Sequence, residues 1–433
     1  MSDDVEWDWF PEGRLSWSLD IVTLLAVIGE SSITDHAQAM TSSTLCLLPR
    51  LIPAPQALLK PARPGRMPEV SAKMAGVYNG ITLDSIGFFA NIITPLDALS
   101  KYSFKVIQIT HSDRSKAGGH YPRRSIKEKV QEFITSPTLI TKDESPAVPP
   151  ALLSPLHIIS LFSFIATIGI LVAAVIWHDG PAIIAVSIIS ITTSIVGYAS
   201  LWRPVLASRK HKNEVPKGDV IIRTREAGFI LIKCDEEVAR ELYSGTEQCD
   251  YYVGEQSYRL LMGASTMMLM VSVVLLGNCT WNSQILTGGT YIILNGLYWG
   301  LGMLPQSQFW DLSRYRVVDV TPKDALNAHT TTDEKDLTEG HESFTRTLWY
   351  AIRETKETGW AERSGAAPNS EQWRRWLHEA KENATKGIRD WKAVERKNFH
   401  MRANILDPKT SHPAAQPAVT DANEKALATP DAV

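Results

Sequence analysis

The stretch LHIISLFSFIATIGILVAAVI, residues 156–176, contains no charged residue. It matches the roughly 20 apolar residues that an α-helix needs to cross about 30 Å of lipid hydrocarbon. Three further apolar runs of similar length follow, at residues 181–201, 260–277 and 285–304. One such run could be a buried helix of a soluble protein, but four runs in two close pairs predict four transmembrane helices.

The loops between the paired runs are short, so each pair is expected to form a membrane hairpin, residues 156–201 and residues 260–304. Neither loop, WHDG (177–180) nor NCTWNSQ (278–284), contains Lys or Arg. Basic residues instead lie in the segment between the hairpins, which begins RPVLASRKHK at Arg203. Because Lys and Arg in short flanking segments favour the cytoplasmic side, we expect this segment and both termini to be cytosolic.

The loop of the second hairpin carries a glycosylation signal, Asn278-Cys279-Thr280, on the expected outer side. Asn278 is therefore a candidate glycosylation site. It stands one residue beyond the apolar run, however, so it would lie against the bilayer and out of reach of a transferase that acts away from the membrane. A polar helix end is the simpler interpretation of the same residue.

The fourth run contains the pattern GLYWG from Gly296 to Gly300, with Asn295 beside it. Small residues four apart let two helix backbones approach closely, and a buried Asn can form hydrogen bonds across the contact. The pattern predicts helix packing or self-association through this run, with a pore-lining role for Asn295 as the alternative. No Asp, Glu, Lys or Arg lies within the four runs, which argues against a proton-coupled transporter.

Between the hairpins, the stretch DVIIRTREAGFILIKC (219–234) predicts two short strands about a turn at Glu226-Ala227-Gly228. Asp235 can then cap a helix that ends at Gly245. We therefore expect a small cytosolic β-β-α connector within residues 202–259. It is too small for an independent core and would be either a binding module or a folded connector.

The flanking regions give weaker signals. Residues 1–150 look like a poorly organised cytosolic region, because prolines crowd the linker from Pro49 to Pro68. Residues 305–407 predict a cytosolic helical tail, in which Phe344 and Leu348 begin one apolar face. Residues 408–433, rich in Ala, Pro and Thr, are typical of a disordered terminus.

One helix of the predicted tail has the composition of a membrane-surface helix. Trp373 and Trp376 lie on one face, with Arg374 and Arg375 beside them. Apolar insertion together with attraction to anionic lipid is how such helices bind a bilayer. Packing of this face within the protein or on a partner is the alternative.

The sequence offers little that would support catalysis. The four cysteines form no CxxC pair and have no zinc-site spacing. We find no nucleophile–base, metal or phosphate-binding motif, so no catalytic, cofactor-binding or metal-binding residue is predicted. The formal net charge of −3 argues against a nucleic-acid binder, which normally carries a basic excess.

Within residues 218–368, the stretches GDVIIRTREAGFILIKCDEEVARELYSG, VSVVLLGNCTW, LNGLYWGLGMLP and FTRTLWYAIRETKETGWAERSGAAP carry a family resemblance. The chain there resembles a group of uncharacterised multi-pass membrane proteins of filamentous fungi. This resemblance implies a membrane protein and adds no mechanism, because no activity or functional residue is established for that group.

The sequence thus predicts an all-α integral membrane protein with four transmembrane helices in two hairpins, a β-β-α insertion and amphipathic tail helices. Charge-free spans, minimal outer loops and a large cytosolic portion favour a non-enzymatic scaffold that binds a partner or self-associates through the fourth run. The alternatives are a subunit of an oligomeric transporter or channel, and a membrane enzyme acting on lipid or small apolar molecules.

Overall fold

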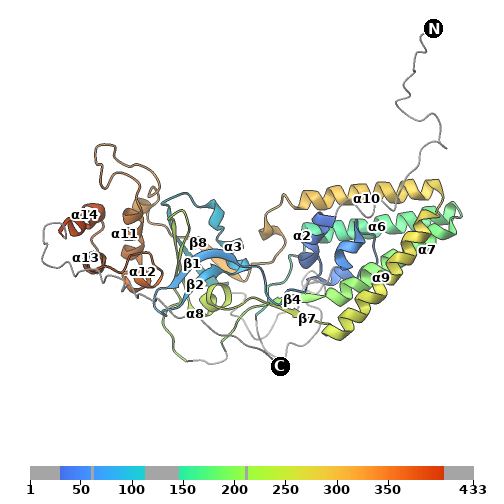
Figure 1. The fold of residues 1–433 in the computed structure, drawn as a ribbon, viewed down its shortest axis with the longest axis horizontal. Coiled ribbons are helices and arrows are strands. Elements are labelled where there is room, and N and C mark those ends of the chain that lie inside the picture. Colours follow the sequence, from blue (N-terminus) through green and yellow to red (C-terminus); the bar gives the residue numbers. More distant parts are fainter. Residues whose placement is uncertain (1–29, 60–62, 113–145, 210–212, 404–433) are drawn as a thin grey trace, which may run out of the picture.

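The molecule has three parts in a row (Figure 1): a bundle of long helices, a β-sheet in the middle and a group of shorter helices at the other end. The computed structural model describes residues 30–59, 63–112, 146–209 and 213–403. The bundle consists of α6 (Pro155–Ile176), α7 (Gly180–Ser200), α9 (Glu255–Gly277) and α10 (Trp281–Leu301).

Three helices of the bundle, α6, α7 and α9, are long and apolar enough to cross a membrane. α7 packs against both α6 and α9, and α10 packs against α6. Large apolar side chains such as Ile158, Ile165 and Leu260 remain exposed on this bundle. Exposed apolar surface of this extent marks contact with another molecule or with lipid, and together with the three long apolar helices it fits a membrane-embedded protein.

The prediction of an all-α protein with four membrane helices is wrong on two counts. A six-stranded sheet occupies the centre of the molecule. Among the described residues only three helices have the length and composition of a membrane span, and α10 is not one of them. Polar residues and glycines, including Gln284, Thr287, Gly296 and Gly300, dilute the apolar content of α10, although it is as long as α7.

The described segment before residue 60, part of the region 1–150 that we expected to be poorly organised, packs into the bundle. It contains α2 (Glu30–Met40), η1 (Thr44–Leu47) and η2 (Pro55–Leu59), and the two short helices contact α7 and α9. Leu51 is buried near the middle of α6: its backbone N–H donates to Thr167 Oγ1 over 2.9 Å, and its carbonyl accepts from the Ser163 hydroxyl. Non-helical backbone inside such a bundle needs partners of this kind.

The six-stranded sheet draws its strands from three distant parts of the chain. The strand order is β2-β1-β5-β6-β3-β8, in which β3 and β6 are parallel and the other neighbours antiparallel. The strands are β1 (Val70–Gly76), β2 (Thr82–Ile86), β3 (Phe104–His111), β5 (Val220–Arg223), β6 (Phe229–Cys234) and β8 (Tyr315–Asp319). A second, two-stranded sheet pairs β4 (Trp202–Val205) with β7 (Gln248–Tyr251).

The predicted β-β-α unit is present, but it is not a small insertion. β5 and β6 form a hairpin where expected, and α8 (Glu236–Ala239) begins after Asp235 and continues as one π-helical turn, η4 (Arg240–Ser244). The hairpin lies at the centre of the sheet. Its neighbours β1 and β3 come from the region 1–150 that we expected to be poorly organised, and β8 comes from the expected helical tail.

The face of the sheet nearer the bundle shares one hydrophobic core with it. Ile222 and Ile232 of the sheet belong to the same buried cluster as Leu156 of α6 and Tyr298 of α10. Trp310 and α3 (Phe88–Ile93) fill the space between these parts, with α8 and η4 against the same face. This continuous core fixes the sheet to the end of the bundle.

Helices of the tail cover the opposite face of the sheet. They are α11 (Phe344–Thr355), α12 (Gly359–Arg363), α13 (Glu371–Thr385) and α14 (Ala393–Ala403). Their indole rings Trp349, Trp360 and Trp376 are buried with Phe229 of β6 in a second core. We call the six-stranded sheet with its helices the sheet domain. The terminal residues 408–433, predicted to be disordered, lie outside the described residues.

Candidate functional site

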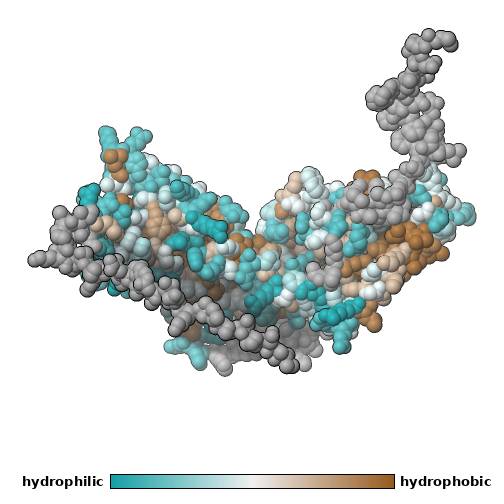
Figure 2. Space-filling model, in the orientation of Figure 1, coloured by the Kyte–Doolittle hydropathy of each residue, from teal (hydrophilic) through white to brown (hydrophobic). Residues whose placement is uncertain are grey.

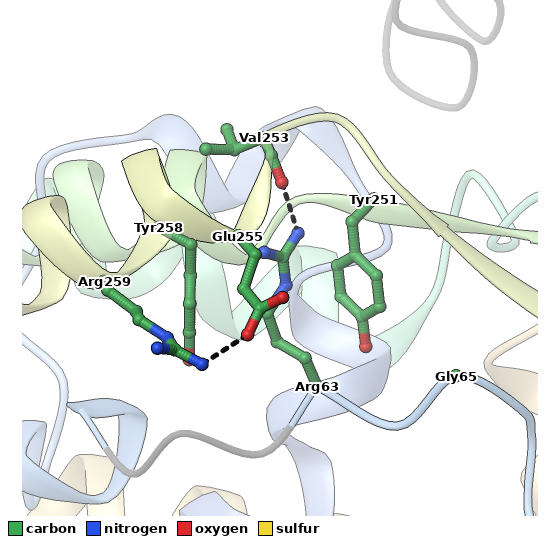
Figure 3. A pocket seen from close by; sticks show the side chains of 7 residues that line it. All are labelled: Arg63, Gly65, Tyr251, Val253, Glu255, Tyr258 and Arg259. Atoms are coloured by element: carbon green, nitrogen blue, oxygen red, sulfur yellow. Dashed lines mark hydrogen bonds and ion pairs between the residues drawn. The ribbon is translucent and has the colours of Figure 1, made fainter.

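A cavity of about 590 Å³ opens where the bundle meets the short β4–β7 sheet (Figure 3). Two arginines, two tyrosines and the first turn of α9 surround it. The lining residues are Arg63, Gly65, Tyr251, Val253, Glu255, Tyr258 and Arg259. The cavity therefore combines positive charge with aromatic rings at one end of a helix that is apolar enough to span a membrane.

Backbone pairing brings the two halves of this site together. Residues 63–67 run beside β7: the Cys249 N–H donates to the Gly65 carbonyl over 3.1 Å, and the Met67 N–H donates to the Glu247 carbonyl over 3.0 Å. Three residues after the end of β7 the chain turns at Gly254, whose extended backbone precedes the first residue of α9. Arg63 is thus placed beneath the start of α9, although it is remote in sequence.

The Arg63 guanidinium lies between two aromatic rings, as Figure 3 shows. Its central carbon is 4.1 Å from the ring centre of Tyr251 and 4.4 Å from that of Tyr258, which are cation–π distances. One terminal nitrogen donates to the Val253 carbonyl over 2.6 Å. Its Nε is buried and has no hydrogen-bond partner among the described residues. Arg63 is therefore fixed in place by the rings, and its Nε–H is left unpaired among the described residues.

The charge of its lining suits this cavity to an anion. Arg259 forms an ion pair with Glu255 one turn earlier in α9, and both side chains are largely exposed. The lining thus carries two guanidinium groups against one carboxylate. Gly254 offers no side chain to cap the first N–H groups of α9, so the positive end of the helix dipole also faces the site. Burial raises the pKa of the Tyr251 hydroxyl, so this ring adds no negative charge at neutral pH.

A second polar cluster lies at the outer edge of the sheet, and its groups are already paired. The buried Glu241 carboxylate accepts from His111 Nε2 at 3.0 Å, from an Arg314 terminal nitrogen at 2.8 Å and from the Tyr315 hydroxyl at 2.6 Å. Burial alone would raise the pKa of Glu241, but these hydrogen bonds outweigh it and hold the pKa at about 2. The cluster joins η4 to β3 and β8, which is a structural role.

The candidate glycosylation residue, Asn278, is exposed at the turn between α9 and α10. Its side-chain amide donates to the Val274 carbonyl over 2.8 Å, so it also serves as the polar end of α9. Next to it, Thr280 donates through its backbone N–H and its hydroxyl to Asp179, each over 2.8 Å. Asp179 is buried in the other bundle turn, so it fastens the two turns together.

Gly296 and Gly300, two of the predicted packing residues of α10, do not meet another helix among the described residues. A Cβ atom added at Gly296 or Gly300 would have no heavy atom within 4 Å outside its own helix and chain neighbours. Gly296 is exposed and Gly300 partly so. Asn295 is half-buried, and its Oδ1 has no hydrogen-bond partner among the described residues. No described residue therefore covers the two glycines of this face.

The structure separates the residues of the predicted membrane-surface helix. Trp376 is fully buried in the second core, and its indole N–H donates to the Ala393 carbonyl over 2.9 Å. Trp373 is half-buried against Trp376, while Arg374 and Arg375 are exposed. The apolar side of α13 thus packs within the protein, which corrects the placement of Trp376 at a membrane.

Sequence reasoning missed the pocket. Tyr258 and Arg259 at the polar end of an apolar run are a weak signal for an interfacial site, but nothing in the sequence joins them to Arg63 in a proline-rich segment. Comparison with protein-family models, with curated proteins and with solved structures finds no match. The geometry of the described residues therefore has to support any functional proposal by itself.

Proposed function

We propose that the protein is a membrane-anchored binding protein that holds its sheet domain at the cytosolic face of a membrane. The observation that carries this proposal is the continuous core between the bundle and the sheet, which includes Tyr298, Trp310 and Ile222. A flexible tether would leave the sheet domain free to reorient. A shared core instead presents one fixed surface of the domain to partners, as a scaffold requires.

The path of the chain supports a location of the whole sheet domain on one side of the membrane. α6 begins and α7 ends beside it, and α9 begins and α10 ends at the same end of the bundle (Figure 1). The turns at residues 177–180 and 278–280 lie at the far end and contain no Lys or Arg. The basic residues Arg203, Arg259 and Arg314 lie at the near end, which favours a cytosolic location for that end.

Labelling of single cysteines tests this orientation. All four native cysteines are buried, so their background reaction with a membrane-impermeant maleimide is expected to be low. In sealed vesicles of known orientation, Asn278→Cys should react from the non-cytosolic side only. Lys335→Cys, on an exposed loop of the sheet domain, should react from the cytosolic side only. The reverse pattern, or reaction of both from one side, would contradict the proposal.

Self-association through α10 is a second part of the proposal. The exposed face that includes Ile285, Ile292, Gly296 and Gly300 has a glycine groove flanked by apolar side chains, which is a shape that two copies can share. Gly296→Leu with Gly300→Leu should abolish the oligomer in mild detergent and leave the melting temperature of the monomer unchanged. Gly263→Leu, at an equally open glycine of α9, is the matched control and should keep the oligomer. An unchanged oligomer in the double variant would contradict this part.

One observation favours the transporter alternative as a second candidate. Arg50 is buried in the bundle, where its guanidinium donates to the Leu45 carbonyl over 2.6 Å while its Nε lacks a partner among the described residues. Ionisable residues inside membranes often mark ion pathways. If the bundle conducts anions, proteoliposomes should show a chloride flux that Arg50→Gln abolishes. An absence of flux in the wild-type protein would leave the scaffold as the function to pursue.

A further inference from the structure

The Arg63 pocket lies at one end of a candidate membrane helix, which is where lipid headgroups would meet water if that helix spans the bilayer. It surrounds the first turn of α9, one of the three helices that can cross a membrane. Directly after Arg259 in the chain, Leu260 is 73% exposed on the outside of the bundle. A charged rim followed at once by an exposed apolar surface is the order in which a lipid presents its headgroup and its acyl chains.

The donors around the cavity suit a phosphate group. Guanidinium groups bind phosphate oxygens through paired N–H donors, and helix N-termini bind the same group through backbone N–H groups. Arg63, Arg259 and the uncapped start of α9 supply both kinds of donor within one cavity. The stacking of Arg63 on Tyr251 and Tyr258 orders this side chain in advance, which reduces the entropy lost on binding.

We propose that this pocket binds the phosphate of an anionic lipid headgroup, with the acyl chains lying along α9. The inference rests on the membrane location of the bundle and goes beyond the proposed function by naming a ligand. A soluble phosphate would use the same donors. The exposed Leu260 favours the lipid, since a soluble ligand gains nothing from an apolar surface beside its site.

Glu255 makes the proposal sharply testable. Its carboxylate lines the pocket and already pairs with Arg259, so it competes with an incoming phosphate for the same guanidinium group. Removing this charge should therefore strengthen phosphate binding. A pocket with only a structural role gives no reason for a tighter complex. Because the side chains of Glu255 and Arg259 are 73% and 75% exposed, their replacement should leave the fold intact.

The experiment uses native mass spectrometry of the full-length protein in mild detergent with added phosphatidic acid, phosphatidylcholine or inorganic phosphate. We expect one phosphatidic acid to bind per chain, in preference to phosphatidylcholine. Arg63→Gln and Arg259→Gln should each weaken this complex about tenfold or more, as loss of a charge-assisted hydrogen bond predicts. Glu255→Gln should strengthen it about fivefold. Arg374→Gln, on the exposed side of α13, removes the same charge elsewhere and should have no effect.

The outcomes separate the sources of the phosphate. If inorganic phosphate displaces the lipid, and the variants change its affinity in the same order as that of the lipid, the site binds the phosphate group. Equal affinity for inorganic phosphate and for the lipid would assign the site to a soluble phosphate and overturn the lipid proposal. Failure of every variant to change binding would overturn the proposal. An equal loss with Arg374→Gln would also overturn it, because the net charge of the protein would then explain the effect. None of these measurements depends on the orientation tested by cysteine labelling.

Discussion

The bundle and the sheet domain are built in opposite ways. Hydroxyl groups are buried inside the bundle, among them Ser163, Thr167 and Thr287, whereas its outside exposes residues such as Ile165. The sheet domain instead buries aromatic rings such as Phe229 between its layers. Figure 2 shows the result: brown hydrophobic surface gathers on the bundle, and teal hydrophilic surface dominates the sheet domain.

This contrast reflects two different solvents. Around the sheet domain, water drives apolar side chains into a core, at roughly 25 cal/mol for each Å² of apolar surface buried. Lipid is as apolar as the side chains, so it provides no such force. The bundle must be held by close packing and by hydrogen bonds between its elements. Substitutions and acid should therefore affect the two regions differently.

Truncation of a large apolar side chain should destabilise only the sheet domain. Phe229 is fully buried between β6 and the tail helices, so Phe229→Ala should lower the free energy of unfolding by about 3–5 kcal/mol. Ile165→Ala, at a side chain of α6 that is 59% exposed, is the matched control and should change it by less than about 0.5 kcal/mol. Chemical denaturation of the full-length protein in detergent measures both values. Similar losses of unfolding free energy in the two variants would mean that apolar burial stabilises the bundle as it stabilises the core of a water-soluble domain.

A charged side chain introduced at an exposed position should instead destabilise the bundle more than the sheet domain. Ile168 is exposed near the middle of α6, so Ile168→Lys would place an ammonium group in hydrocarbon at a cost of about 2.5–3.5 kcal/mol. Val317→Lys, on the exposed part of edge strand β8, should cost less than about 0.5 kcal/mol. The fraction of each variant that inserts into membranes is the measurement. Full insertion of Ile168→Lys would show that this face does not meet lipid.

Acid should weaken the sheet domain through Glu241. Its pKa of about 2 in the folded protein lies below the ordinary value of 4.5, so its contribution to stability is complete above about pH 4.5 and is lost as the pH falls towards 2. The shift corresponds to about 3 kcal/mol, and we expect about 2 kcal/mol because the partner Arg314 is one-third exposed. Melting temperatures between pH 6 and pH 3 should fall in the wild type. Glu241→Gln should be less stable at pH 6 and flatter with pH, and an unchanged slope would contradict this assignment.

The smallest effect concerns the hydrogen bonds inside the bundle. Thr167→Val keeps the shape of the side chain but leaves the Leu51 N–H without its acceptor, which should cost about 1–2 kcal/mol. Thr266→Val is the matched control, because the Thr266 hydroxyl donates only to the Met262 carbonyl of its own helix. Thermal unfolding in detergent compares the two. Equal melting temperatures would mean that Leu51 does not depend on this hydroxyl.

Local patterns predicted local structure well. The two short apolar runs within residues 219–234 and the turn at Glu226-Ala227-Gly228 place β5 and β6 correctly, because strand and turn preferences act over a few residues. The apolar spacing from Phe344 onwards likewise predicts α11. The neighbours of β5 and β6 were not predictable in this way, since pairing with β1 and β3 joins parts of the chain that share no local signal.

The sequence alone determined that the chain forms long helices apolar enough to cross a membrane, because the length and composition of a segment are local properties. Only the tertiary structure decided what those helices enclose and what lies at their ends. Leu51 enters the bundle because hydroxyls of α6 accept and donate to its backbone. Arg63 reaches Tyr258 because residues 63–67 pair beside β7. Both contacts depend on groups that are distant in sequence, and the free energy of such contacts exists only once the chain has folded.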